Sequence, residues 1–254
     1  MRTTTWRRWS GTALALLVLL VPMRASAIDV TELLARARQA LEPGTDMRAG
    51  FDFTIANARG ESVHWTGVYY RRSVPDSRIR LLFDSPLDLR GTDVVVRRAT
   101  DGISRTRIYL PGLRREREID ADMRGESFLG TDFNYEDLGL QHLDFQQHTL
   151  VGEEELDGRA CYRLESVPDR GWWYGKIVRS IDTKTFLPRR TEYYDRSGVL
   201  WKVRTFNDVK TVNGFPTATR IAMQTVPTGT STTITLSDIQ YNTKLADVLF
   251  EQRP

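Results

Sequence analysis

The spacing of hydrophobic residues changes once along the chain. Between residues 29 and 41 apolar side chains recur at helical spacing, and the breaker pair Pro43-Gly44 follows. From residue 50 onward apolar and polar residues alternate, as in GFDFTIA at 50–56 and SVHWTGVYYR at 62–71. A period of two is typical of strands that have one apolar face. The pattern therefore predicts one amphipathic helix followed by a sheet.

Predicted turns separate the strand-like segments. Six dipeptides end in glycine, which supplies the positive φ that tight hairpins need. We expect an antiparallel meander of about ten strands, and such a sheet curls because adjacent strands twist by about 20 to 25°. Few further helices are expected: a central segment and a short stretch at 244–251. The six dipeptides are Arg59-Gly60, Asp101-Gly102, Asp157-Gly158, Ser197-Gly198, Asn213-Gly214 and Thr228-Gly229.

The first 27 residues have the features of an export signal. Arginines precede an uncharged, apolar segment at 11–21, and Ala25-Ser26-Ala27 gives the small-residue pattern at which signal peptidase cleaves. We expect the cut after Ala27, with a signal peptide at 1–27 and one exported domain at 28–254. An uncleaved N-terminal anchor is the alternative. The protein is therefore predicted to be exported.

The charge balance argues against a nucleic-acid partner. The predicted signal peptide holds four of the 36 Lys and Arg residues and none of the 33 Asp and Glu residues, which leaves 32 basic against 33 acidic residues. Paired arginines are scattered, and we expect them on solvated strand faces. These pairs are Arg71-Arg72, Arg97-Arg98, Arg114-Arg115 and Arg189-Arg190.

Common motifs of catalysis and metal binding do not occur in the sequence. It contains no nucleophile elbow, P-loop, dinucleotide-binding glycine motif or paired-cysteine motif. The histidines His64, His142 and His148 match no common ligand spacing, and Cys161 is the single cysteine, so no internal disulfide forms. We therefore expect neither an enzyme nor a metal or cofactor site.

The segment GESFLGTDFNYEDLG at 125–139 mixes aromatic and acidic residues. Asn134 followed by Asp137 resembles the capping box of a short helix, and Asp132 suits a turn or cap. With Glu136 these acids lack the spacing of a calcium-binding loop. We interpret the acids as residues that begin short helices, and the apolar residues as a cover over an apolar surface.

Residues 107–139, RIYLPGLRREREIDADMRGESFLGTDFNYEDLG, resemble the signature of the outer-membrane lipoprotein-sorting proteins, the LolA-like superfamily of Gram-negative bacteria. GRACYRLE at 158–165 and LADVLFEQR at 245–253 are similar as well, so the resemblance covers essentially all of the chain after residue 27. It implies a mainly β fold: an incomplete, strongly curved antiparallel β-barrel with a few covering helices and a hydrophobic cavity.

The resemblance also implies a function. Members of this superfamily carry acyl chains through the periplasm, so a carrier or chaperone for a lipid or lipoprotein is expected. The implied partners are an inner-membrane lipid exporter or lipoprotein-releasing complex as donor and an outer-membrane acceptor. The alternative is a cell-envelope sensor or adaptor that binds a lipid or peptide signal with the same concave sheet. Exchange of cargo between membranes separates the two hypotheses.

Two groups of apolar residues are candidates for contact with lipid, although core packing explains each of them individually as well. Trp172 and Trp173 in the predicted loop GWWYG suit either packing at the rim or a surface role. The candidates for the cavity wall are Phe51, Phe53, Ile55, Val63, Trp65 and Tyr69, and those for the cover are Phe128, Leu129, Phe133, Tyr135 and Leu138.

Overall fold

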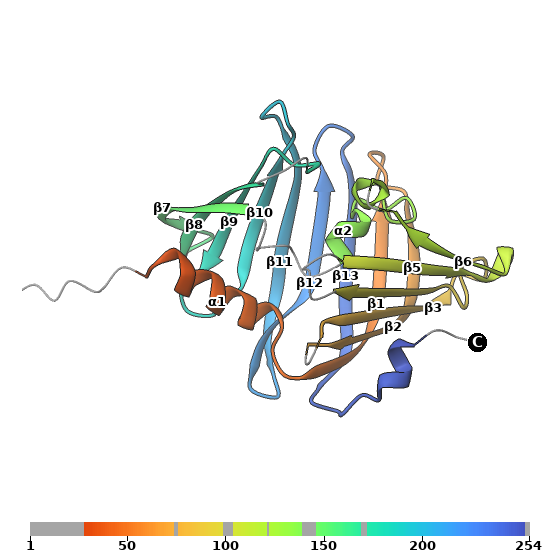
Figure 1. Cartoon of the computed structure of the whole chain (residues 1–254). Coiled ribbons are helices and arrows are strands. Elements are labelled where there is room, and N and C mark those ends of the chain that lie inside the picture. The colour runs from red at the N-terminus through yellow and green to blue at the C-terminus, as the bar shows by residue number, and fades with distance from the viewer. Residues whose placement is uncertain are drawn as a thin grey trace, which may run out of the picture.

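One antiparallel sheet makes up most of the protein (Figure 1). The computed structural model describes residues 28–251 apart from 74–75, 99–103, 121, 139–145 and 169–171. The helices are α1 (Val30–Leu41), α2 (Tyr135–Leu138) and the 3-10 helices η1 (Pro111–Leu113), η2 (Met123–Gly125) and η3 (Asp247–Phe250). The strands are β1 (Asp46–Ala56), β2 (Ser62–Arg72), β3 (Arg78–Ser85), β4 (Asp93–Arg98), β5 (Ser104–Leu110), β6 (Arg115–Ile119), β7 (Gln146–Leu156), β8 (Arg159–Pro168), β9 (Lys176–Asp182), β10 (Pro188–Tyr194), β11 (Leu200–Val212), β12 (Phe215–Thr225) and β13 (Thr230–Tyr241).

The strand order explains why the sheet has a cover. Its order is β6-β5-β4-β3-β2-β1-β13-β12-β11-β10-β9-β8-β7, so the chain starts in the middle, moves out to one edge, passes to the other edge and returns to the middle. The connection from β6 to β7 therefore has to reach between the two edges of the curled sheet. It carries η2 and α2, and Figure 1 shows α2 inside the curl near β13 and β1.

The predicted fold class is confirmed, because the thirteen strands form a curved antiparallel sheet that does not close into a barrel. Five of the six glycine turns connect neighbouring strands, and their glycines have positive φ. The sixth, Asp101-Gly102, lies outside the described residues. The sheet has more strands than expected partly because β6, with the sequence REREI, shows no apolar alternation.

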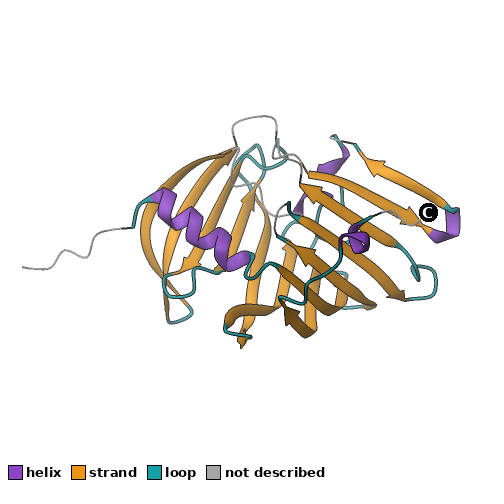
Figure 2. Cartoon of the chain, turned by 60° about the horizontal axis from the view of Figure 1, so that its bottom comes forward, coloured by secondary structure: helices purple, strands orange, loops and turns teal. Residues whose placement is uncertain are grey.

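Helix α1 confirms the helix predicted at 29–41. The Asp29 carboxylate accepts a hydrogen bond of 2.8 Å from the backbone N–H of Glu32, which is an N-cap interaction. Leu33 is fully buried against Leu164 and Ile181 of β8 and β9. Figure 2 shows α1 lying across this end of the sheet. The helix therefore fills the part of the concave face that the β6–β7 connection does not cover.

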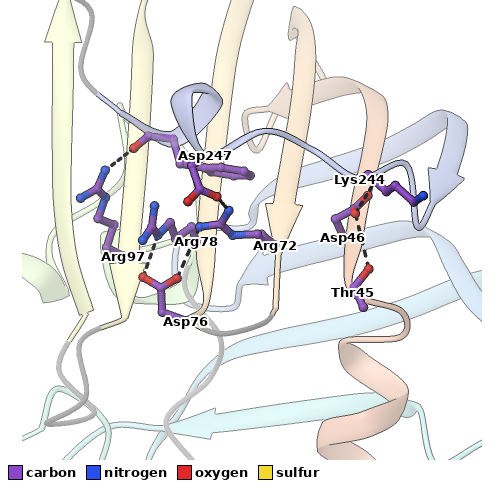
Figure 3. Close-up of polar contacts among 9 residues, drawn as sticks. Thr45, Asp46, Arg72, Asp76, Arg78, Arg97, Lys244 and Asp247 are labelled. Carbon is purple, nitrogen blue, oxygen red and sulfur yellow. Dashed lines mark hydrogen bonds and ion pairs between the residues drawn. The ribbon is translucent and has the colours of Figure 1, made fainter.

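The C-terminal segment, residues 242–251, forms a strap on the outer face of the sheet (Figure 3). Arg72 of β2 makes an ion pair with Asp247, and its guanidinium lies 5.4 Å from the ring of Phe250. Arg97 of β4 donates a hydrogen bond of 2.5 Å to the carbonyl oxygen of Phe250. Since Phe250 is fully buried, the strap holds strands β2 to β4 together from outside.

The prediction that Arg71 and Arg72 lie on a solvated face is wrong. Arg71 is 3% exposed and donates hydrogen bonds to the carbonyl oxygens of Leu41 and Pro43, while Arg72 is 8% exposed. The acceptors of Arg71 lie about 30 residues earlier in the chain, and Arg72 pairs with Asp247 of the C-terminal segment as well as with the nearby Asp76. The local pattern does not reveal the distant partners.

Two findings concern the membrane. Among the described residues, no helix is long and apolar enough to cross a bilayer. The predicted signal peptide at 1–27 lies outside the described residues and stays a prediction.

Candidate functional site

An apolar cavity lies on the concave side of the sheet. It has a volume of about 170 Å³ and is lined by Phe51, Phe53 and Tyr69 from the predicted wall. Burial raises the pKa of Tyr69 to about 12, so its hydroxyl stays neutral at physiological pH. Other apolar residues that line the cavity are Met47 of β1 and, from further strands, Ile79, Leu81, Phe206, Ala218, Ile221, Ile234 and Leu236.

Trp65 lies beside the cavity rather than in its wall. Its ring stacks on Phe53 with 6.4 Å between centroids and meets Phe83 edge-on at 6.1 Å. Trp65 therefore supports the wall from the neighbouring strand. The structure brings three of the six predicted wall residues to the cavity.

Arg204 is one of three charged residues that line the apolar cavity, together with Arg71 and Asp137. Its guanidinium lies 5.3 Å from the ring of Phe133 and 5.0 Å from the ring of Phe206. Contacts of a guanidinium with two aromatic faces partly compensate for lost hydration. Arg204 thus places a positive charge at the point where the cavity meets its cover.

The cover segment, residues 125–138, closes the cavity with aromatic side chains. Phe128 and Phe133 are buried, and their ring centroids lie 6.4 and 6.5 Å from that of Phe53. Phe133 and Leu138 line the cavity itself. The remaining cover candidates, Leu129 and Tyr135, pack against the same cluster.

Asp137 behaves as the capping interpretation predicts. Its carboxylate accepts a hydrogen bond of 2.8 Å from the backbone N–H of Asn134, at the start of α2. The hydroxyl of Tyr174 donates to Asp137 at 3.2 Å and accepts from the side-chain amide of Asn134 at 3.1 Å. Burial, followed by the charge of Asp137, raises the pKa of Tyr174 well above its usual value. This hydroxyl therefore stays protonated and ties the GWWYG segment to the cover.

Asp132 lies in a bend, as the turn interpretation allows, but its side chain caps no described helix and bonds to the sheet instead. Its buried carboxylate accepts hydrogen bonds from the hydroxyls of Thr225 and Thr230, both 2.6 Å, and of Thr232 at 2.8 Å. Its backbone N–H donates to Thr232 at 3.0 Å. The three threonines lie about a hundred residues further along the chain, which is why the local sequence does not show the contact.

Lys202 of β11 completes this attachment. Its ammonium donates hydrogen bonds of 2.6 Å to the carbonyl oxygen of Asp132 and to the side-chain oxygen of Asn134. Burial lowers the pKa of Lys202, and the charges of Asp137 and Asp132 oppose this effect. We call Lys202 with the hydroxyls of Thr225, Thr230 and Thr232 the threonine site.

The GWWYG segment also packs directly on the cover. A Cβ atom added to Gly125 would lie 1.8 Å from Nε1 of Trp173, so the indole fits only because residue 125 has no side chain. Trp172 packs at the edge of the cluster around Tyr174. Both tryptophans therefore contribute to packing near the cover. The sequence alone did not decide between packing and a surface role for them.

A polar pocket of about 620 Å³ lies on the other side of the cover segment. Asp132 and Asn134 line it, whereas Phe133 between them lines the apolar cavity. The predicted wall residues Ile55 and Val63 line this polar pocket. Its other lining residues are Ala56, Asn57, Glu61, Ser62, Gly125, Ser127, Gly130, Thr131, Trp201, Lys202, Thr225, Thr228 and Thr230.

Acidic and histidine side chains do not gather into a metal site. No three His, Cys, Asp or Glu residues in the described part of the chain are grouped to hold an ion. Glu136 faces Arg124 at 3.8 Å, and His148 contacts Ser166 at 2.8 Å. His64 lies near Asp52 on the outer face, and His142 is outside the described residues.

Comparison with known proteins identifies a family and several solved structures that are similar to this chain. A family model described as "Uncharacterized protein" matches residues 76–254. The chain belongs to this family. A DUF1329 family protein from Desulfovibrio piger has a similar structure, with 27% identity and a TM-score of 0.81 over 86% of this chain and 94% of that one. No curated protein matches the sequence.

Two further solved structures are similar to this chain. A domain from Vibrio parahaemolyticus, named as an outer membrane lipoprotein-sorting protein, is 29% identical with a TM-score of 0.80, over 86% of this chain and 94% of that one. A LolA superfamily protein from Nitrosomonas europaea shares the fold at 18% identity, with a TM-score of 0.71 over 89% of this chain and 99% of that one. The resemblance to the LolA-like superfamily is confirmed.

Proposed function

We propose that this protein is a periplasmic carrier that holds acyl chains of a lipid or lipoprotein in its apolar cavity. The observation that carries the proposal is the covered cavity itself, with a wall of Phe, Leu, Ile and Met side chains on the concave sheet. A named lipoprotein-sorting domain of similar structure supports it. The function requires binding and release, with no covalent step.

The cavity provides the driving force for this function. Each methylene group removed from water contributes about 0.8 kcal/mol, so about five methylenes give roughly 4 kcal/mol. A volume of about 170 Å³ holds only part of a long acyl chain. Binding of a whole chain therefore includes displacement of the cover segment, whose Phe133 and Leu138 line the cavity.

The proposed location and partners follow from the same role. The predicted signal peptide at 1–27 would bring the carrier to the periplasm. An inner-membrane lipid exporter or lipoprotein-releasing complex would supply the cargo, and an outer-membrane acceptor would receive it. Differences in affinity between these partners and the cavity then set the direction of transfer.

A cavity-filling variant tests the proposal. Ala218 lines the cavity, so Ala218→Phe puts a ring where the acyl chain would lie. We expect the affinity for a fluorescent fatty-acid probe to fall by about tenfold or more, which corresponds to about 1.4 kcal/mol. Fluorescence titration measures the affinity, and thermal unfolding verifies that the variant is folded.

The matched control is Ala222→Phe. Ala222 lies on the same strand next to the cavity-lining Ile221 but does not itself line the cavity. This variant should bind the probe like the parent protein. Unchanged binding by folded Ala218→Phe would show that the cavity is not the lipid site.

A further inference from the structure

The concave face changes from apolar to polar along strands β11 and β13, which flank β12 in the sheet. On β13 the face runs from Leu236 and Ile234 in the apolar cavity to Thr230 in the polar pocket. On β11 it runs in the same way from Phe206 to Lys202. The cavity and the pocket are therefore two ends of one trough, and the cover segment crosses it between them.

The threonine site lies at the polar end of this trough and holds an anion. Thr225, Thr230 and Thr232 all direct their hydroxyl hydrogens to the carboxylate of Asp132, at 2.6 to 2.8 Å. Hydrogen bonds to an ionised acceptor are about twice as strong as neutral ones. The carboxylate belongs to the cover, whereas the hydroxyls belong to the rigid sheet. When the cover moves away, the sheet loses its anion and keeps the donors.

Lys202 makes the vacated site more attractive to an anion. The ammonium of Lys202 donates to the carbonyl oxygen of Asp132 and to the side chain of Asn134, which both belong to the cover. Displacement of the cover leaves the ammonium without these partners in a buried position. Glu61, the other acid that lines the polar pocket, lies in the β1–β2 turn and accepts a hydrogen bond from Asn57.

We propose that the threonine site binds the anionic head group, a phosphate or carboxylate, of the amphiphile whose tail enters the apolar cavity, and that Asp132 occupies this site in its absence. The inference rests on the proposed carrier function. Thr232 and Ile234 are two residues apart on one face, which is about 7 Å along a strand. A head group at the threonine site therefore has its first methylenes at the cavity. Cargo binding and release of the cover are then coupled, because the head group replaces the Asp132 carboxylate at the threonine site.

Three ligands with the same tail test the inference: dodecyl phosphate, dodecanoate and dodecanol, titrated calorimetrically below their micellar concentrations. The parent protein should bind the better of the two anionic ligands at least about ten times more tightly than the alcohol. Whichever of the two anions binds more tightly shows whether the head group is a phosphate or a carboxylate. Equal binding of all three overturns the inference alone, whereas no binding of any ligand overturns the proposed function with it.

Variants of the threonine site separate head-group binding from cover release. Thr225→Val with Thr230→Val keeps the side-chain shape and removes two hydroxyls, so the preference for the anion should fall to about threefold or less. Thr225→Ser with Thr230→Ser keeps the hydroxyls and should keep the preference. A Val variant that folds cooperatively and retains the full preference overturns the inference.

Asp132→Asn should strengthen ligand binding, in contrast to the Val variants, if Asp132 competes with cargo for the threonine site. The amide is a weaker acceptor than the carboxylate, so the closed state loses stability while the donors on the sheet remain. We expect all three ligands to bind about threefold or more tightly than to the parent protein, with the preference for the anion retained. If folded Asp132→Asn binds dodecyl phosphate and dodecanoate no more tightly than the parent, Asp132 is not a competitor and the inference fails.

Discussion

Single polar residues hold the cover, and the sequence around each of them gives little sign of this role. Asp132 lies in a segment that resembles helix caps, and Lys202 interrupts an ordinary strand pattern, LWKVRTF at 200–206. The available signal is the alternation in β13, where Thr230 and Thr232 share a face with Ile234. Threonines at positions where the rest of the face is apolar indicate a buried polar partner, because buried hydroxyls need hydrogen bonds.

Gly125→Ala tests the packing of the GWWYG segment on the cover. The new Cβ would lie 1.8 Å from Nε1 of Trp173, so the indole has to move. We expect a loss of about 1 to 3 kcal/mol in the free energy of unfolding, as for other overpacked sites. Denaturant titration measures the change.

The control for this variant is Gly112→Ala, because a Cβ at Gly112 meets no atom within 4 Å. It should leave stability unchanged or slightly increased, since alanine reduces the entropy of the unfolded chain. A Gly125→Ala protein as stable as Gly112→Ala would mean that Trp173 does not pack on the cover as described.

At the level of elements, the sequence predicts those helices, strands and turns that have a local pattern of spacing, caps or glycines. Helix α1, strands β1 and β2 and the short helix α2 follow from spacing and caps, and the glycine turns mark the hairpins. Strand β6 was missed because four of its five residues are exposed and charged. The outer strap was expected only as a helix, since its fixation depends on arginines of β2 and β4 that are distant in sequence.

Asp46 of β1 fixes the start of the strap and makes it sensitive to acid. Its carboxylate accepts hydrogen bonds from the backbone N–H and hydroxyl of Thr243 at 2.7 and 2.8 Å and from the backbone N–H of Lys244 at 2.9 Å. Figure 3 shows Asp46 beside Lys244. Burial alone would raise the pKa of Asp46, but these hydrogen bonds lower it below the ordinary value of 3.8.

Asp46→Asn should therefore destabilise the protein in a pH-dependent way. The depressed pKa stabilises the folded state above about pH 4, and this contribution is lost as the pH falls through the folded-state pKa. Asparagine has one acceptor oxygen for three donors, so we expect a loss of about 1 to 3 kcal/mol at pH 7. The difference from the parent should shrink toward pH 3 in denaturant titrations.

Asp52→Asn is the control for this effect, because Asp52 lies on the same strand with a side chain 44% exposed. Its substitution should change stability by less than about 0.5 kcal/mol. An Asp46→Asn deficit that stays constant between pH 7 and pH 3 would contradict the assigned role of the carboxylate.

At the scale of the whole molecule, the topology couples the cavity to its cover. The chain has to pass from one edge of the curled sheet to the other, and residues 125–138 of this passage line both the apolar cavity and the polar pocket. The sequence predicted the curl, the apolar face and a covering segment. It did not predict the division into an apolar cavity and a polar pocket, because that division depends on which strands lie side by side in the folded sheet.

Transfer of lipid between vesicles is the final prediction, and it separates a carrier from a sensor. Donor vesicles contain a self-quenched fluorescent lipid with an anionic head group, and acceptor vesicles are unlabelled. A carrier that covers the acyl chain lowers the cost of its passage through water, about 0.8 kcal/mol for each methylene shielded. We expect the parent protein and Ala222→Phe to accelerate dequenching at least about tenfold over vesicles alone, and Ala218→Phe to give little acceleration. A sensor would bind the lipid and leave the transfer rate unchanged. Binding without acceleration by the parent protein would therefore contradict the carrier function while leaving the cavity as a lipid site.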